Sequence, residues 1–188
     1  MRILKAFYSN ILKYLLWLVL STMFWAWIFT FVRDTTADKK VVLYADVFSM
    51  SDRALDVRLE EEMPEGIEMI RVHLFSYAMF NDASLGQGDL YILPEWEVEE
   101  MIEDLAPLSL DGAYEYYWHE GEPYGILIYD AKTGTGIAQD YIQYLAPGQE
   151  PQNYYLFFGA RSVHLDEQDE TARLVARSLL SITGEAAP

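Results

Sequence analysis

The chain has 188 residues, a net charge of −17 and no cysteine. All 30 acidic residues follow Arg33, so the first 33 residues carry a charge of +4 and the remainder carries −21. So acidic a remainder repels nucleic acid and anionic headgroups, which argues against a DNA- or RNA-binding protein and against a domain lying flat on a membrane. Without cysteine, disulfides and thiol chemistry are excluded as well.

An uncharged apolar stretch near the N-terminus, residues 14–32, contains neither Pro nor Gly. Its 19 residues are about the number that a helix needs to cross a bilayer core. Trp25 and Trp27 near its end suit a membrane–water interface. We therefore expect a transmembrane helix whose partner is the lipid bilayer; the alternative is a buried core helix.

The charges flanking this helix predict its orientation. A short basic tail precedes it and a long acidic domain follows, which favours a cytoplasmic N-terminus and an extracytoplasmic C-terminal domain. Cleavage as a signal peptide after small residues 35–37 is the alternative, but the apolar run is long for a signal sequence. We expect an uncleaved single-pass anchor over residues 1–33 and a polar tether over residues 34–40.

The first half of the domain predicted over residues 41–183 alternates strands and helices. A buried strand over 41–45 precedes a helix that ends near residue 63, with Ser49 or Ser51 as its N-cap. Leu55, Leu59 and Met63 are expected on its inward face, and a second strand follows over 67–75. A third strand over 89–93 is followed by a helix over 95–105. This order predicts an α/β fold of three layers with a mostly parallel sheet.

The second half is predicted to add a hairpin, a further strand, an amphipathic helix and a flexible tail. These elements span residues 114–118 with 124–129, 154–158, 167–182 and 184–188. Residues 137–145 fit either a helix or a strand, and the sequence leaves that choice open.

Sequence motifs of common enzymes are missing. The chain has no G-x-S-x-G elbow, no phosphate-binding G-x-x-x-x-G-K-[ST] and no G-x-G-x-x-G. Residues 132–134, KTG, match one motif of penicillin-binding enzymes, yet no Ser-x-x-Lys is present to supply the nucleophile. We therefore predict that the protein is not an enzyme.

No metal or cofactor site is predicted either. The three histidines, His73, His119 and His164, are isolated in sequence and lack zinc-ligand spacing. The acidic runs 60–62 and 97–104 lack the order of a calcium-binding loop, so solvated helix faces explain them better. A catalytic pair of carboxylates remains open in so acidic a chain, but the sequence singles no pair out.

A candidate ligand site follows from the geometry of parallel sheets. In an open α/β sheet, ligands bind outside the carboxyl ends of the parallel strands. The residues predicted to lie there offer carboxylates, hydroxyls and aromatic rings. They are Asp46, Phe48, Ser49, Ser76, Tyr77, Glu95 and Trp96. The alternative is that these are ordinary loop residues.

The order of elements resembles one lobe of the extracellular solute-binding proteins of ABC transporters. Segments that carry the resemblance are DLYIL at 89–93, LAPL at 105–108 and GEPYGI at 121–126, within a likeness that spans residues 40–182. The resemblance implies a binding domain beside a transporter. Two departures stand out: the chain has room for one lobe of the usual two, and it lacks the cysteine of a lipid anchor.

Together these observations predict a membrane-anchored, extracytoplasmic, non-catalytic binding or accessory domain, associated with an ABC transporter. It would bind a small solute. The alternative is a docking module of a membrane complex that binds no small molecule.

Overall fold

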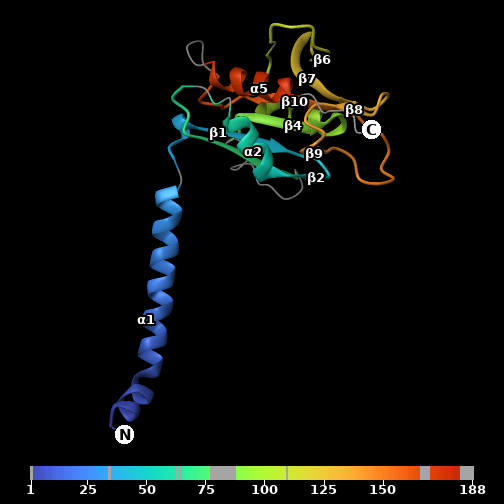
Figure 1. Ribbon diagram of the computed structural model, residues 1–188. Coiled ribbons are helices and arrows are strands. Elements are labelled where there is room, and N and C mark those ends of the chain that lie inside the picture. Colours follow the sequence, from blue (N-terminus) through green and yellow to red (C-terminus); the bar gives the residue numbers. More distant parts are fainter. Residues whose placement is uncertain are drawn as a thin grey trace. The chain divides into compact units, whose positions relative to one another are not determined.

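The computed structural model describes residues 2–33, 35–61, 63, 65–76, 88–108, 110–165 and 170–182 (Figure 1). The chain divides into two compact units, Met1–Thr36 and Ala37–Pro188. The second unit combines helices with a mixed six-strand sheet. The predicted α/β class is therefore confirmed.

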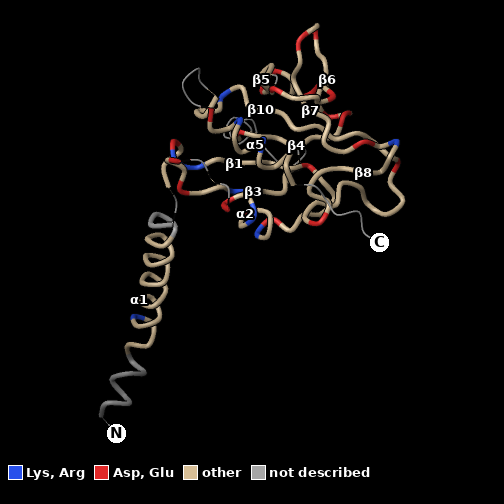
Figure 2. Tube along the Cα trace, turned by 45° about the horizontal axis from the view of Figure 1, so that its top comes forward, with Lys and Arg blue, Asp and Glu red and all other residues tan. Residues whose placement is uncertain are grey.

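Helix α1 (Arg2–Arg33) contains the apolar stretch Asn10–Phe29, whose 20 residues have a mean hydropathy of 1.6 and are 0 % buried. The Thr22 hydroxyl donates to the Leu18 carbonyl oxygen at 2.9 Å, so this polar group is satisfied within the helix. Acidic residues are spread over the domain, whereas none lies in α1 (Figure 2). The helix is long and apolar enough to enter a membrane or to serve as a signal sequence, and it is not a buried core helix.

The main sheet has the strand order β3-β1-β4-β10-β7-β6. In that order the strands span Met69–Leu74, Lys40–Ala45, Leu90–Pro94, Tyr154–Gly159, Glu122–Asp130 and Tyr116–His119. Two short strands extend the sheet, β5 (Leu105–Ala106) beside β10 and β8 (Thr135–Gly136) beside β7. A separate ladder joins β2 (Ser49–Met50) to β9 (Ile142–Gln143).

The sheet is mixed rather than mostly parallel. β3, β1 and β4 are parallel, as predicted, but β10 is antiparallel to both β4 and β7. The tight turn between β6 and β7 places Glu120 and Gly121 at φ of 49° and 89°, which fits a two-residue hairpin loop. The late strand β10 lies in the middle of the sheet because of pairings between distant residues, and local sequence patterns carry no information about those pairings.

Helices α2 (Asp52–Glu60) and α5 (Thr171–Ser181) pack in one core cluster with the sheet. Leu55 and Leu59 of α2 and Val175 and Leu179 of α5 are all at most 1 % exposed. Their spacing of four residues brings each pair onto one helix face. These four side chains therefore belong to the core, whereas Leu174, which the helical spacing of residues 167–182 also predicts to face inward, is 42 % exposed.

A second core cluster lies against Tyr91 and Phe157 and includes Val98 and Met101. These two residues belong to a segment predicted as one helix over 95–105. The structure divides the segment into η3 (Glu95–Glu97), α4 (Val98–Met101) and η4 (Ile102–Asp104). The acidic residues recur four positions apart along it, and like charges at that spacing destabilise a continuous helix.

The sequence also makes predictions for residues 137–145, for the start of α2 and for residues 167–188. Residues 137–145 form turns and the two-residue strand β9, neither a helix nor a longer strand. Ser51 stands at the N-cap of α2 but makes no side-chain capping hydrogen bond. The helix expected over 167–182 is α5, while residues 166–169 and the tail 184–188 lie outside the described residues.

The domain begins within the segment expected to be a tether. Residues Ala37–Lys39 form a 3-10 turn, η1, and β1 starts at Lys40. The His164 ring is 1 % exposed, and its Nε2 lies 3.0 Å from the Ala37 carbonyl oxygen and 3.2 Å from that of Lys40. Because carbonyl oxygens only accept, Nε2 carries the hydrogen and the histidine has a structural role here.

Candidate functional site

The three parallel strands end at a common edge of the sheet. Past the strand ends, the Phe75 amide donates to the Ala45 carbonyl at 2.7 Å and the Asp46 amide donates to the Ile92 carbonyl at 2.8 Å. These hydrogen bonds hold the ends of β3, β1 and β4 in line. The edge therefore collects the first residues of three loops, as the sequence predicted for Asp46, Ser76 and Glu95.

Six of the seven predicted site residues can be located. Asp46 and Ser76 are half-buried, while Phe48 and Trp96 are 51 % and 62 % exposed. Ser49 is exposed and pairs with Gln143 in the small ladder. Glu95 is exposed and accepts a hydrogen bond from Asn153 Nδ2 at 2.9 Å. Tyr77 lies outside the described residues.

The residue that sequence reasoning missed is Glu97. It lies in η3, just after β4, and is 3 % exposed. Burial, the charge of Asp46 and a hydrogen bond with the Asp46 carboxyl raise the pKa of Glu97 to about 8. Glu97 is therefore mostly protonated at neutral pH and donates to Asp46, so the two carboxyl groups form a pair that shares a proton.

One atom of this pair lacks a partner. Oε2 of Glu97 is buried, and no hydrogen-bond partner is found for it among the residues that the structure describes. An unsatisfied buried oxygen costs about 1–3 kcal/mol, and such costs concentrate at functional sites. The Asp46–Glu97 pair is thus the strongest chemical feature of the carboxyl edge.

A signal for Glu97 does exist in the sequence. Glu97 stands four residues before Met101 and next to Val98, so in a helical segment it shares their inward face. Four nearby acids, however, point to solvent, and composition alone does not distinguish the buried one. The expectation that the early acids of this segment simply face water is wrong for Glu97.

Tyr154, the first residue of β10, borders the pair. The pKa of its phenol is raised mainly by burial, and the charges of Asp46 and Glu97 raise this pKa further. Its hydroxyl donates to the Tyr144 carbonyl oxygen at 2.8 Å and accepts from Gln152 Nε2 at 3.0 Å. Because its hydroxyl already donates one hydrogen bond and accepts another, the neutral Tyr154 side chain is held in one orientation beside the pair.

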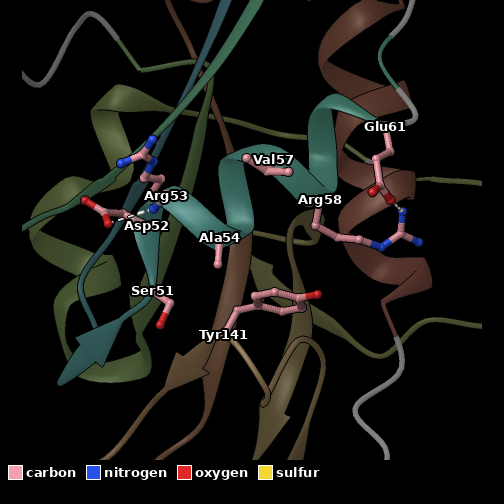
Figure 3. A pocket seen from close by; sticks show the side chains of 8 residues that line it. All are labelled: Ser51, Asp52, Arg53, Ala54, Val57, Arg58, Glu61 and Tyr141. Carbon is pink, nitrogen blue, oxygen red and sulfur yellow. Dashed lines mark hydrogen bonds and ion pairs between the residues drawn. The ribbon is translucent and has the colours of Figure 1, made fainter.

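A shallow open hollow of about 650 Å³ lies along α2. It is lined by Ser51, Asp52, Arg53, Ala54, Val57, Arg58, Glu61 and Tyr141 (Figure 3). The side chains of Arg58 and Glu61 point toward each other and form an ion pair at 2.8 Å (Figure 3). The hollow is a surface depression beside one helix, with part of its charge already neutralised, and it lacks the buried polar group that marks the carboxyl edge.

The residue types of a hydrolytic triad meet elsewhere, but their hydrogen bonds are structural. Ser162 Oγ donates to Asp89 Oδ1 at 2.6 Å, and Oδ2 of Asp89 accepts from the Val42 amide at 2.8 Å. His164 donates its backbone amide to Ser162 Oγ at 3.1 Å. Because His164 Nε2 bonds to the carbonyl oxygens of Ala37 and Lys40, the imidazole is not placed as the base of a catalytic triad.

Among the described residues, no group of three or more His, Asp or Glu side chains is arranged to hold a metal ion. No family model, no curated protein and no solved structure matches this chain.

Proposed function

We propose that this protein is a membrane-anchored, non-catalytic binding module whose domain lies outside the cytoplasm. The proposal rests on an exposed apolar helix of membrane-spanning length followed by an acidic α/β domain. The basic residues before the apolar stretch favour a cytoplasmic N-terminus. In this proposal the domain is related to one lobe of the solute-binding proteins and works beside an ABC transporter.

The ligand that fits the carboxyl edge best is a small organic cation. The observation that carries this proposal is the Asp46 carboxyl, oriented by the protonated and buried Glu97. Two exposed aromatic rings flank the pair in sequence, Phe48 two residues after Asp46 and Trp96 one residue before Glu97. A carboxylate with aromatic faces is the combination that recognises ammonium groups.

A binding role fits the pair better than catalysis. Glycosidases separate their two carboxyl groups by about 5 Å or more so that substrate or water fits between them. Here the two groups are hydrogen-bonded to each other, and Glu97 is 3 % exposed. One lobe also supplies only one wall, so a transporter subunit would complete the pocket and raise the affinity.

The ligand class is testable with the full chain in maltoside micelles. We expect choline to bind at millimolar or lower concentration, and its uncharged isostere 3,3-dimethylbutanol to bind at least ten times more weakly, because only choline meets the carboxylate. Calorimetric titration measures both. Asp46→Asn should abolish the difference between the two ligands, whereas Glu122→Gln, an exposed acid at the opposite edge of the sheet, should preserve it. Equal binding of both ligands by the native chain would refute a cation site.

The anchor is testable in intact cells. We expect the full-length chain to stay in the membrane pellet after alkaline carbonate extraction and to begin at its original N-terminus by mass spectrometry. Protease added outside the cytoplasmic membrane should degrade the domain. A mature chain beginning near residue 37 would instead identify α1 as a cleaved signal sequence.

A second candidate function is protein docking through the edge strand β6. Trp118 on this strand is 61 % exposed and stacks edge-on against Tyr116 at 6.4 Å between ring centroids, with Tyr114 next at 6.5 Å. Tyr114 and Tyr116 are half-buried against the core, whereas Trp118 is exposed, and an exposed tryptophan is typical of interface anchors. If β6 is the docking surface, the Trp118→Ser variant should lose its binding to a membrane partner, whereas the Asp46→Asn variant should keep it.

A further inference from the structure

A second hollow, of about 440 Å³, lies over one face of β1 and β3. It is lined by Ala37, Lys40, Val42, Tyr44, Arg71, His73, Asp89, Arg161 and Val163. Strand register brings these side chains together, since Val42 is opposite Arg71 and Tyr44 is opposite His73. Alternate residues of both strands therefore present one face of the sheet to this hollow, and the turn after β10 adds Arg161.

The charge of this lining is opposite to that of the domain. Lys40, Arg71 and Arg161 are three of only nine basic residues that follow Arg33, while the lining takes one of 30 acids. That acid, Asp89, is 4 % exposed, and its two oxygens already accept from Ser162 and from the Val42 amide. The lining therefore carries a net positive charge in a strongly negative domain.

The basic side chains come from three separate segments, and both guanidinium groups are exposed. Arg161 is 68 % exposed at its side chain and meets Asp104 at 3.4 Å, a pair that contributes little at such exposure. Arg71 is exposed on the edge strand β3. Guanidinium groups bind phosphate oxygens through two parallel hydrogen bonds, so two arginines with a lysine suit a phosphate group.

The surroundings limit the size of the ligand. The charge of −21 that follows Arg33 repels long polyanions such as nucleic acids. A hollow of about 440 Å³ has the size of a small-molecule site. A lipid headgroup and a soluble metabolite both carry such a phosphate group, and the negative charge of the domain favours the soluble source.

We propose that this basic hollow binds one phosphate group of a small ligand through Arg71, Arg161 and Lys40. The site is separate from the Asp46–Glu97 pair and does not depend on the cation-binding role proposed for it. Neither arginine belongs to that pair, so failure of one proposal leaves the other intact.

The test uses the full chain and two phosphate probes. In maltoside micelles, glycerol 3-phosphate is titrated calorimetrically. In phosphatidylcholine nanodiscs, the melting temperature is compared with and without 20 mol% phosphatidic acid. Arg71→Gln with Arg161→Gln should weaken binding at least tenfold, because each charged hydrogen bond contributes about an order of magnitude in affinity.

A matched control replaces two arginines outside the hollow, one of them exposed like Arg71 and the other beside an aspartate like Arg161. Arg53 is exposed and Arg177 meets an acid, Asp111, at 3.7 Å, so Arg53→Gln with Arg177→Gln makes the same change in charge outside the hollow. If the chain binds glycerol 3-phosphate, and Arg71→Gln with Arg161→Gln loses this binding while the control variant keeps it, the ligand is a soluble phosphate compound. If only phosphatidic acid raises the melting temperature, and Arg71→Gln with Arg161→Gln loses this shift, the ligand is a lipid headgroup. No response to either probe, or equal losses in both double variants, overturns the proposal.

Discussion

Glu97→Gln is expected to raise the stability of the domain above pH 8 and to remove most of the pH dependence that Glu97 causes. The pKa of Glu97 is about 8 in the folded domain against 4.5 for an ordinary glutamate. The folded state therefore holds the proton more tightly than the unfolded state. Stability is greatest below pH 4.5 and falls as the pH rises to about 8, by up to about 1.4 kcal/mol per pH unit from this group. Glutamine stays neutral throughout.

The measurement is guanidinium unfolding of the full chain in micelles from pH 5 to pH 9, followed by near-ultraviolet circular dichroism. The curves of the native chain and of Glu97→Gln should diverge as the pH rises, with the variant the more stable at pH 9. Glu99→Gln, an exposed acid two residues further on, should follow the native curve. Parallel curves for the native chain and Glu97→Gln would mean that Glu97 is charged in the folded domain.

Gly159→Ala is expected to cost about 3 kcal/mol and to lower the melting temperature by roughly 6–12 °C. Gly159 ends β10, and its amide donates to the Asp89 carbonyl oxygen at 2.9 Å. An added Cβ would collide with the backbone carbonyl oxygen of Gly88 and lie 3.1 Å from the Tyr91 ring. Gly88 lies two residues before β4, whose Leu90 pairs with Phe158 of β10, and the Asp89 amide donates to the Val42 carbonyl at 2.9 Å. Neither backbone can therefore move away without losing hydrogen bonds.

Gly148→Ala separates this collision from the general effect of replacing glycine. Gly148 has φ of +83° and no atom within 4 Å of the added Cβ, so its replacement should cost about 1 kcal/mol of backbone strain alone. Thermal unfolding of both variants gives the comparison. Equal melting temperatures would contradict a close backbone contact between residues 88 and 159.

The local features of the fold were readable from the sequence, and the long-range pairings were not. Continuous apolar runs predicted β1 and β4, and helical spacing predicted that Leu55 and Leu59 of α2 face the core. The same patterns place Asp46 and Trp96 just past strand ends. They could not place β10 between β4 and β7, because that position depends on pairings between strands far apart in the sequence.

The candidate sites likewise combine features readable from the local sequence with features that depend on the folded structure. The sequence by itself determined an apolar helix long enough to span a membrane, the contrast between a basic start and an acidic domain, and a loop edge that contains Asp46. Only the tertiary structure decided that Glu97 is buried against Asp46, and that Lys40, Arg71 and Arg161 share one hollow. The physical reason is that both arrangements join side chains from separate strands and loops, whose proximity and desolvation arise only when the sheet assembles.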